Sequence, residues 1–251
     1  MGTIIISLGN IGSGKTACMV REMFLNKDMR TTYSNILTKG LKFNKAIDPS
    51  MIIKRTLIDI KHKRDGSSEE IFKLELNKEY WQKVKEPVNV IIDEAHSIIN
   101  ARKARSPVNI VVSDWIALMR RVLGEDATTE GELVFITQLP RRIDVIAREM
   151  AHQVRYHTCH YIKTCEKCGT SWSENSDMPE KLKVCPYCGN FRMRKHTFQI
   201  EVWHFKGMDA YIGWKDFGLN SYYKHYFVRD IEYYFQFYET LQWDNLFSEY
   251  Y

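Results

Sequence analysis

Near its N-terminus the chain reads Gly9-Asn10-Ile11-Gly12-Ser13-Gly14-Lys15-Thr16. This stretch matches the phosphate-binding pattern G-x-x-x-x-G-K-[ST] at every fixed position. The apolar residues 3–8 before it predict a buried strand, and residues 17–25 after it predict a helix. Strand, glycine loop and helix is the order that a phosphate-binding loop requires, so the stretch predicts a site for a nucleoside triphosphate.

The fixed positions of this loop have physical tasks. Glycines let backbone N–H groups curl around phosphate oxygens without Cβ clashes, and the helix N-terminus adds a dipole that favours negative charge. Lys15 is expected to reach the β- and γ-phosphates, and the Thr16 hydroxyl to ligate Mg²⁺. The predicted nucleotide-binding residues are Gly9, Gly12, Ser13, Gly14, Lys15, Thr16 and, from a later strand, Asp93. The alternative is an ordinary glycine-rich turn.

Outward from the loop, predicted strands alternate with predicted helices. Strands are expected at residues 30–36, 88–92 and 133–138, and helices at 78–85, 113–123 and 143–151. A turn at 65–68 joins strands 57–63 and 70–76 into a hairpin, 127–131 is a loop, and 222–241 is a helix or a strand followed by a helix. The alternation predicts an α/β fold of the P-loop NTPase type, with a mainly parallel sheet flanked by helices on both faces.

Two acidic residues and a glutamine follow the buried strands. Strand 88–92 runs directly into Asp93 and Glu94, and strand 133–138 ends in Gln138. Ligands of parallel α/β folds bind at the carboxyl ends of strands, so these side chains are expected beside the glycine loop. Asp93 is predicted to hold Mg²⁺, Glu94 to act as general base on water, and Gln138 to sense the γ-phosphate or position the water. The predicted catalytic residues are thus Lys15, Glu94 and Gln138. An acidic pair capping a strand, and a polar strand end, are the alternatives.

Four of the six cysteines form two C-x-x-C pairs, Cys165 with Cys168 and Cys185 with Cys188, separated by sixteen residues. This spacing fits a known zinc pattern, and four thiolates form a closed, structural site. Disulfides or an iron–sulfur cluster are the alternatives. The polar segment 171–182 cannot build a core, so the metal is expected to supply its folding free energy.

These cysteines divide the chain into two predicted units. A P-loop ATPase core is expected at residues 1–153 and 206–251, and an inserted zinc-ribbon β-hairpin at 154–205, with long strands at 153–163 and 192–205. Basic and aromatic residues interleave in the ribbon, which favours contact with nucleic acid. A solvated hairpin or a contact between subunits accounts for the same composition equally well.

Length, composition and charge set broad limits. The chain has 251 residues, 44% of them hydrophobic, and a net charge of +5, which suits one large domain and is compatible with a polyanionic partner. No stretch approaches the roughly 18 apolar residues of a membrane span. No signal peptide precedes the first strand, so a soluble, cytoplasmic protein is expected.

Taken together, these motifs resemble the zonula-occludens-toxin-like (Zot-like) ATPases of filamentous viruses, within the wider HerA/FtsK superfamily of DNA-pumping ATPases. The likeness is carried by residues 9–16, Tyr33-Ser34-Asn35-Ile36, residues 90–96, Phe135-Ile136-Thr137-Gln138, Asp144, Arg148 and Phe237-Tyr238-Glu239-Thr240. It implies a RecA/FtsK-like fold and ATP hydrolysis by a ring, often a hexamer. Filamentous-virus members usually continue into a membrane span and lack the cysteine insertion, so this chain looks more like a viral genome-packaging ATPase of the same group.

The sequence therefore predicts an ATP-hydrolysing motor that translocates DNA in viral genome packaging, with ATP, Mg²⁺ and Zn²⁺ as cofactors. DNA and further copies of the chain in a hexameric ring are the expected partners, and viral coat or assembly proteins are further candidates. The expected location is the host cytoplasm, or the virion. The alternatives are a virion assembly or extrusion motor acting on a protein partner, a nucleotide-regulated zinc adaptor without turnover, and a small-molecule kinase.

Overall fold

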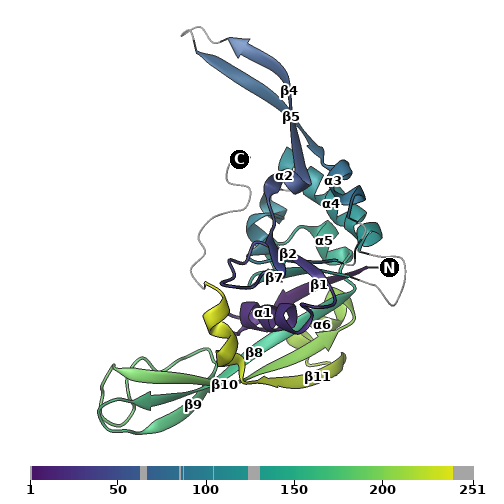
Figure 1. Cartoon of the computed structure of the whole chain (residues 1–251). Helices are drawn as coiled ribbons and strands as arrows, with labels where there is room; N and C mark the ends of the chain where they lie inside the picture. The colour runs from purple at the N-terminus through teal and green to yellow at the C-terminus, as the bar shows by residue number, and fades with distance from the viewer. Residues whose placement is uncertain are drawn as a thin grey trace.

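A mainly parallel sheet runs through the middle of the molecule (Figure 1). The computed structural model describes residues 2–62, 67–84, 86, 88–103, 105–123 and 131–239. The strand order within these residues is β11-β10-β8-β1-β7-β6-β2-β3, and β9 pairs with β8. The bounds of these strands are β1 Thr3–Leu8, β2 Thr31–Ser34, β3 Asn44–Ala46, β6 Val88–Ile92, β7 Glu132–Thr137, β8 Gln153–Cys165, β9 Ser171–Asn175, β10 Met193–Phe205 and β11 Tyr222–Arg229.

The central strands β8, β1, β7, β6 and β2 pair in parallel. Of these, β1, β6 and β7 are mostly apolar in sequence, which is typical of strands covered on both faces. In the middle of the sheet Ile5 of β1 pairs with Val134 of β7, and both side chains are buried. Beyond β8 the strands β10 and β11 continue antiparallel. The mainly parallel α/β sheet that the sequence predicts is therefore confirmed.

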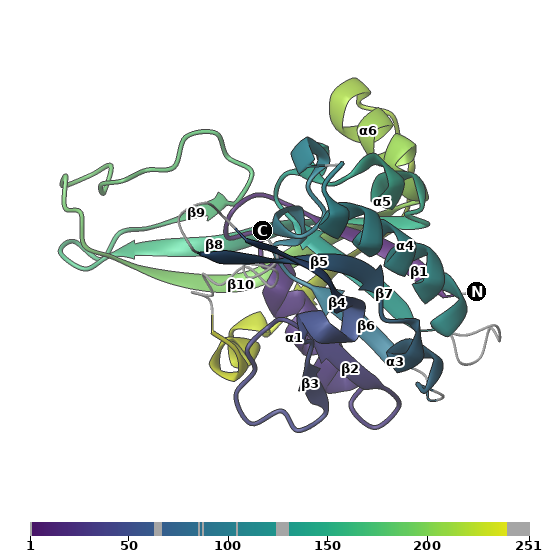
Figure 2. The same ribbon diagram turned by 90° about the horizontal axis from the view of Figure 1, so that it is seen from above.

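Helices cover both faces of the sheet (Figure 2). On one face, α1 and the 3₁₀-helix η4 bury Met19, Val20 and Ile231 against the strands. The other face is covered by α3, α4, α5 and α6: Trp81 of α3 packs against Trp115 of α4, and Tyr211 of α6 packs against Tyr156 and Phe205. The bounds are α1 Lys15–Leu25, α3 Lys78–Gln82, α4 Pro107–Val122, α5 Val145–Glu149, α6 Gly207–Phe217 and η4 Ile231–Phe237, with short 3₁₀ turns η1 Ala95–Ser97, η2 Ala101–Lys103 and η3 Pro140–Arg142.

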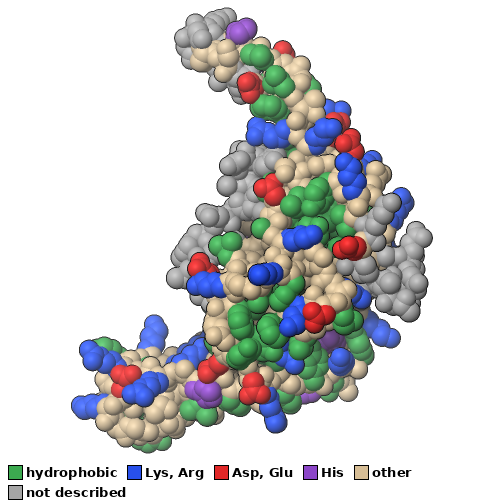
Figure 3. All heavy atoms as spheres, in the orientation of Figure 1, with side chains coloured by type: hydrophobic (Ala, Val, Ile, Leu, Met, Phe, Trp, Pro, Cys, Tyr) green, Lys and Arg blue, Asp and Glu red, His purple; other side chains and the backbone are tan. Residues whose placement is uncertain are grey.

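Two β-structures project from opposite ends of the body (Figure 1), and both stand clear of it in the space-filling view (Figure 3). One is the hairpin of β4 (Ile53–His62) and β5 (Ser68–Leu76), which follows α2 (Pro49–Ile52). It confirms the predicted hairpin, although residues 65 and 66 of the predicted turn lie outside the described residues. The other projection is formed by the outer parts of β8 and β10, together with β9 and the cysteine pairs. We call this second projection the cysteine ribbon.

Several predicted helix boundaries were wrong. α4 begins at Pro107, six residues before the predicted 113, because the Ser106 hydroxyl accepts the Asn109 N–H and proline suits the first helical turn. α5 is shorter than predicted, because the Asp144 side chain caps it by accepting the N–H of Ile146. These caps fix where each helix starts, and hydrophobic periodicity alone did not locate them.

Other segments were unassigned or ambiguous in the sequence. No helix was predicted where α6 lies; it ends at Gly218 in the left-handed conformation that glycine favours. The ambiguous segment 222–241 contains a strand, β11, followed by η4. α3 ends at Gln82, before the predicted 85. Residues 85, 127–130, 240 and 241 of the predicted elements lie outside the described residues.

Candidate functional site

The glycine loop joins β1 to α1 through a left-handed turn. Gly14 is the N-cap of α1, with φ at 82°. A Cβ atom at this position would lie 2.1 Å from the Cδ1 atom of Ile200 in β10. Backbone conformation and close packing therefore both require glycine here. The loop places its backbone N–H groups at the N-terminus of an 11-residue helix, where the helix dipole favours an anion.

The side chain of Lys15 is folded against the same loop. Its ammonium donates to the carbonyl oxygens of Gly9 at 2.8 Å and Asn10 at 3.0 Å, and to the Ser13 hydroxyl at 3.3 Å. Burial lowers the pKa of Lys15 to about 8, and nearby carboxylates, Asp93 foremost, oppose that shift. The Lys15 ammonium is thus held at the loop, where phosphate oxygens would bind.

Thr16 and Asp93 meet across the end of β6. The Thr16 hydroxyl donates to Asp93 Oδ2 at 2.7 Å. Asn35, directly after β2, clamps the backbone of Asp93: its Oδ1 accepts the Asp93 N–H at 2.7 Å, and its Nδ2 donates to the Asp93 carbonyl at 2.9 Å. Burial raises the pKa of Asp93. A hydroxyl and a carboxylate side by side are the hard oxygen ligands that Mg²⁺ takes, so these residues fit that ion.

Glu94 and Gln138 meet beside this pair. Gln138 Nε2 donates to Glu94 Oε1 at 3.2 Å, and the other carboxylate oxygen lies 3.2 Å from His96 Nδ1. Glu94 has a positive φ of 50°, one of two such non-glycine residues among those described. This conformation costs of order 1–3 kcal/mol and is characteristic of functional sites. Here it occurs directly where the chain leaves β6 and the carboxylate meets Gln138.

These side chains line one cavity of about 780 Å³, a size typical of pockets that enclose a small organic ligand. The predicted residues that line it are Gly12, Ser13, Gly14, Lys15, Thr16, Asp93, Glu94 and Gln138. Gly9, the first residue of the loop, is not among the residues that line the cavity. A Cβ atom there would approach the carbonyl oxygen of His157 to 2.6 Å, so Gly9 lets the loop pass close to β8.

One polar contact between the glycine loop and the segment after β9 was not predicted from the sequence. Asn10 Nδ2 donates to Asp177 Oδ1 at 3.1 Å. Asp177 follows β9, and its other carboxylate oxygen accepts from the hydroxyls of Thr158 at 2.7 Å and Tyr156 at 3.1 Å. This carboxylate therefore connects the glycine loop, β8 and the cysteine ribbon. Sequence separation of more than 160 residues leaves no local signal for such a contact.

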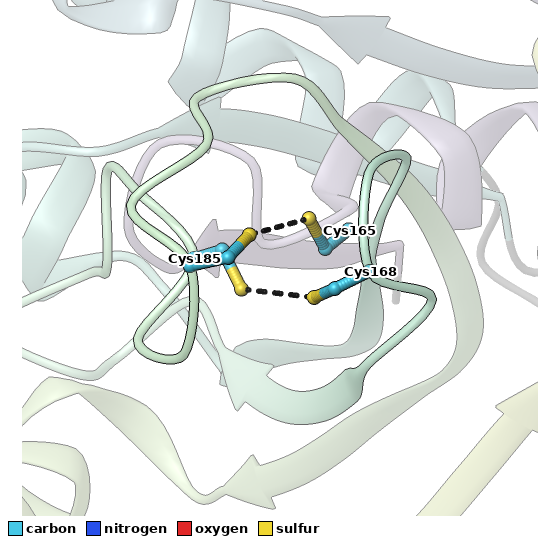
Figure 4. Close-up of side chains that lie close together, drawn as sticks. Cys165, Cys168 and Cys185 are labelled. Atoms are coloured by element: carbon cyan, nitrogen blue, oxygen red, sulfur yellow. Dashed lines mark hydrogen bonds between the residues drawn. The ribbon is translucent and has the colours of Figure 1, made fainter.

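The four cysteines of the two C-x-x-C pairs lie together at the end of the cysteine ribbon. Their sulfur atoms all lie within 4.8 Å of one another. Figure 4 shows the side chains of Cys165 and Cys168 on one side and Cys185 on the other, pointing toward one another. The Sγ–Sγ distance is 3.6 Å from Cys165 to Cys188 and also from Cys168 to Cys185. All four are free thiols, so the disulfide alternative is not realised. A hydrogen bond from the Cys168 backbone N–H lowers the pKa of Cys165 to about 6, which favours the thiolate.

The geometry fits a tetrahedral ion. Zinc–sulfur bonds of about 2.3 Å place tetrahedral sulfur atoms about 3.8 Å apart, close to the spacing of these thiols. Four cysteine ligands leave no open position for a substrate, so such a site is structural. Residues 166–196 contain too few buried apolar side chains to stabilise this segment without a metal. Their buried side chains are Glu174, Ser176 and Cys185.

Comparison with protein families gives one match. The model of the family described as Zonular occludens toxin (Zot) matches residues 3–200, well over half of the chain. Among curated proteins, no sequence matches the chain. No helix in the described residues combines the length and the apolar character needed to cross a bilayer.

Solved structures are similar to the chain at low sequence identity. The N-terminal domain of zonular occludens toxin from Neisseria meningitidis is 18% identical over 95% of this chain and all of that one, with a TM-score of 0.47. The genome packaging NTPase B204 from Sulfolobus turreted icosahedral virus 2, in complex with ATP-gammaS, is 14% identical over 61% of this chain and 74% of that one, with a TM-score of 0.36. The fold assignment rests on the sheet order and the glycine loop described above.

Proposed function

Because the chain belongs to the zonular occludens toxin (Zot) family, we propose that it is an ATP-hydrolysing motor that moves DNA during viral genome packaging. One observation carries the proposal: Glu94 and Gln138, at the ends of two adjacent strands, meet beside the glycine loop. A site that only held a nucleotide would need the loop and the Thr16–Asp93 pair alone. A carboxylate next to an amide is the additional chemistry that orients and deprotonates water.

In the proposed reaction each side chain has one task. Lys15 and the loop N–H groups bind the phosphate oxygens. Thr16 and Asp93 hold Mg²⁺, which when bound neutralises charge on the β- and γ-phosphates. The Gln138 amide orients a water molecule, and the Glu94 carboxylate takes its proton as the water oxygen attacks the γ-phosphorus. The bond from the γ-phosphorus to the β,γ-bridging oxygen breaks at the same time, and ADP and inorganic phosphate leave. The Glu94 side chain is 48% exposed, so water reaches it from solvent.

The proposed motor works as a ring, with a hexamer as the expected assembly. Phosphoryl transfer needs positive charge where negative charge builds up in the transition state. Arg141 and Arg142 lie in η3, shortly after Gln138, and both are exposed. They are the arginines that we propose for insertion into the cavity of a neighbouring copy. Native mass measurement with ATP and Mg²⁺ tests this: we expect a hexamer, and a monomer under all conditions would contradict the ring.

The cysteine ribbon is the proposed DNA contact. Tyr187 and Phe191 are 75% and 72% exposed near the second cysteine pair. Exposed aromatic rings among cations are the combination that binds bases and phosphates. The neighbouring cations are Lys167, Lys181, Lys183, Arg192 and Arg194. A contact between subunits would use the same side chains, and the DNA experiment below separates the two.

The test is the rate of ATP hydrolysis by the zinc-loaded full chain, with and without double-stranded DNA. We expect turnover that DNA accelerates, and loss of that acceleration in a Tyr187→Ala/Phe191→Ala variant. Turnover accelerated by viral coat protein and not by DNA would favour an assembly or extrusion motor instead. Tight ATP binding without turnover would overturn the motor and leave a nucleotide-regulated adaptor.

A further inference from the structure

The helix η4 presents one side to the body of the protein. A 3₁₀-helix repeats every three residues, so side chains three apart share a face. Ile231, Tyr234 and Phe237 form the face that packs on α1. There the Phe24 ring lies 5.9 Å from the Tyr234 ring and 5.7 Å from the Phe237 ring, measured between centroids. This face accounts for the docking of η4.

The next face of η4 carries a different set of side chains. Glu232, Phe235 and, one position beyond the helix, Tyr238 are again three residues apart, and all three line the cavity that begins at the glycine loop. Phe235 is 38% exposed, and among the described ring contacts it has one, edge-on to Tyr238 at 6.5 Å. Packing of η4 on α1 does not require a phenyl ring here.

Strand β10 supplies the facing wall. Lys195 and Thr197 line the same cavity. The Glu232 carboxylate accepts from the Thr197 backbone N–H and lies 2.8 Å from His196 Nδ1, so η4 and β10 are tied together at this point. The Lys195 ammonium lies over the Tyr161 ring, 3.9 Å from its centroid. Together β10 and η4 therefore present a hydroxyl, an ammonium and a carboxylate to the cavity.

The two ends of the cavity thus differ in chemistry. At the loop end, backbone N–H groups and Lys15 favour phosphate. At the η4 end, an aromatic ring, a carboxylate that accepts and an ammonium that donates suit a flat group that carries hydrogen-bond donors and acceptors. We infer that the η4 end is the nucleoside subsite, in which the base stacks on Phe235 while Glu232 and Lys195 bind its polar groups or those of the sugar. The inference rests on the proposed function, because it takes the triphosphate to be bound at the loop.

Two ligands distinguish binding at the loop end of the cavity from binding at the η4 end. Titration calorimetry with Mg²⁺ measures the affinity of the full chain for ATP and for inorganic tripolyphosphate, which lacks the nucleoside. Stacking on an aromatic ring accounts for about 10-fold in affinity, so Phe235→Ala and Phe235→Leu should weaken ATP binding by that factor. Their affinity for tripolyphosphate should stay within about twofold of the wild type. Phe235→Tyr should restore ATP binding, because the tyrosine ring also stacks.

Tyr233→Ala is the matched control, because Tyr233 is a ring of η4 that contacts Phe24 of α1 and does not line the cavity, so the variant also tests whether loosening the packing of η4 alters binding. It should leave both affinities unchanged. Equal weakening of both ligands by Phe235→Ala, or weakening of neither, would overturn the nucleoside subsite and leave the phosphate site standing. Wild-type protein that binds neither ATP nor tripolyphosphate would overturn the proposed function together with the subsite.

Discussion

The sheet that carries the glycine loop and the cysteine ribbon differ in what is buried inside them. The loop rests on parallel strands whose apolar side chains are buried on both faces of the sheet. Between residues 166 and 196 of the ribbon, by contrast, the buried side chains are two polar residues and one cysteine. Hydrophobic burial stabilises the first region, and we propose that the second depends on a metal bound by its four cysteines for its folding free energy. Substitutions in the cavity should therefore alter ATP binding or turnover, while substitutions of the cysteines should alter the folding of the ribbon.

The largest effect is expected from Lys15→Ala. The hydrogen bonds of the Lys15 ammonium all go to the loop itself, so its loss should not unfold the sheet. Removal of a positive charge from the transferred phosphate should lower ATP turnover by about 10³-fold. Steady-state phosphate release measures this. Lys181→Ala, an exposed lysine of the ribbon, is the control, and equal loss in both variants would contradict a special role for Lys15.

Glu94→Gln should separate hydrolysis from binding. Glutamine has the shape of glutamate but cannot accept the proton of water, so turnover should fall by about 10²–10³-fold. ATP affinity should stay close to that of the wild type, because Lys15, Thr16 and Asp93 are unchanged. Single-turnover hydrolysis and calorimetry give the two numbers. Turnover that survives in Glu94→Gln would remove Glu94 from the chemistry and return it to the role of a strand cap.

Much of the cavity was predictable because its parts have local signals. The glycine loop is contiguous, and the apolar strands that end in Asp93, Glu94 and Gln138 are recognisable one by one. The carboxyl ends of neighbouring parallel strands lie at the same edge of a sheet, so their meeting followed from the fold class. The cysteine spacing was equally local. Roles for these side chains remain predictions until the variants are measured.

The remainder depends on contacts between distant segments. Asn35 was noted only as part of a family resemblance, and its clamp on the Asp93 backbone appears only when β2 lies beside β6. The cavity face of η4 was hidden because a 3₁₀-helix has neither the period of an α-helix nor that of a strand. Asp177 had no signal, since its partner Asn10 precedes it by 167 positions.

Metal removal should break the ribbon and spare the sheet. With a chelator, or in Cys168→Ser, the ribbon loses the four-sulfur cluster, and residues 166–196 have no apolar core of their own. Trypsin should then cleave rapidly at Lys181 and Lys183, while ATP affinity should fall by no more than about fivefold. Added Zn²⁺ should restore protection in the chelated wild type. A metal-free protein that resists trypsin as well as the zinc-loaded one would show that the ribbon folds without the metal.

The smallest effect tests the point where the two regions touch. Asn10 in the loop donates to Asp177, which follows β9 in the sequence. A hydrogen bond of this kind contributes about 1 kcal/mol to the stability of the contact. Asn10→Ala and Asp177→Ala should each weaken ATP binding about threefold, and the double variant should be no weaker than either single one. Calorimetry on the wild type, the two single variants and the double variant gives the four affinities of this double-mutant cycle. Thr158→Val, which removes a contact of Asp177 that does not reach the loop, is the control. Additive losses would mean that the two residues act independently, and that the ribbon does not support the loop through this carboxylate.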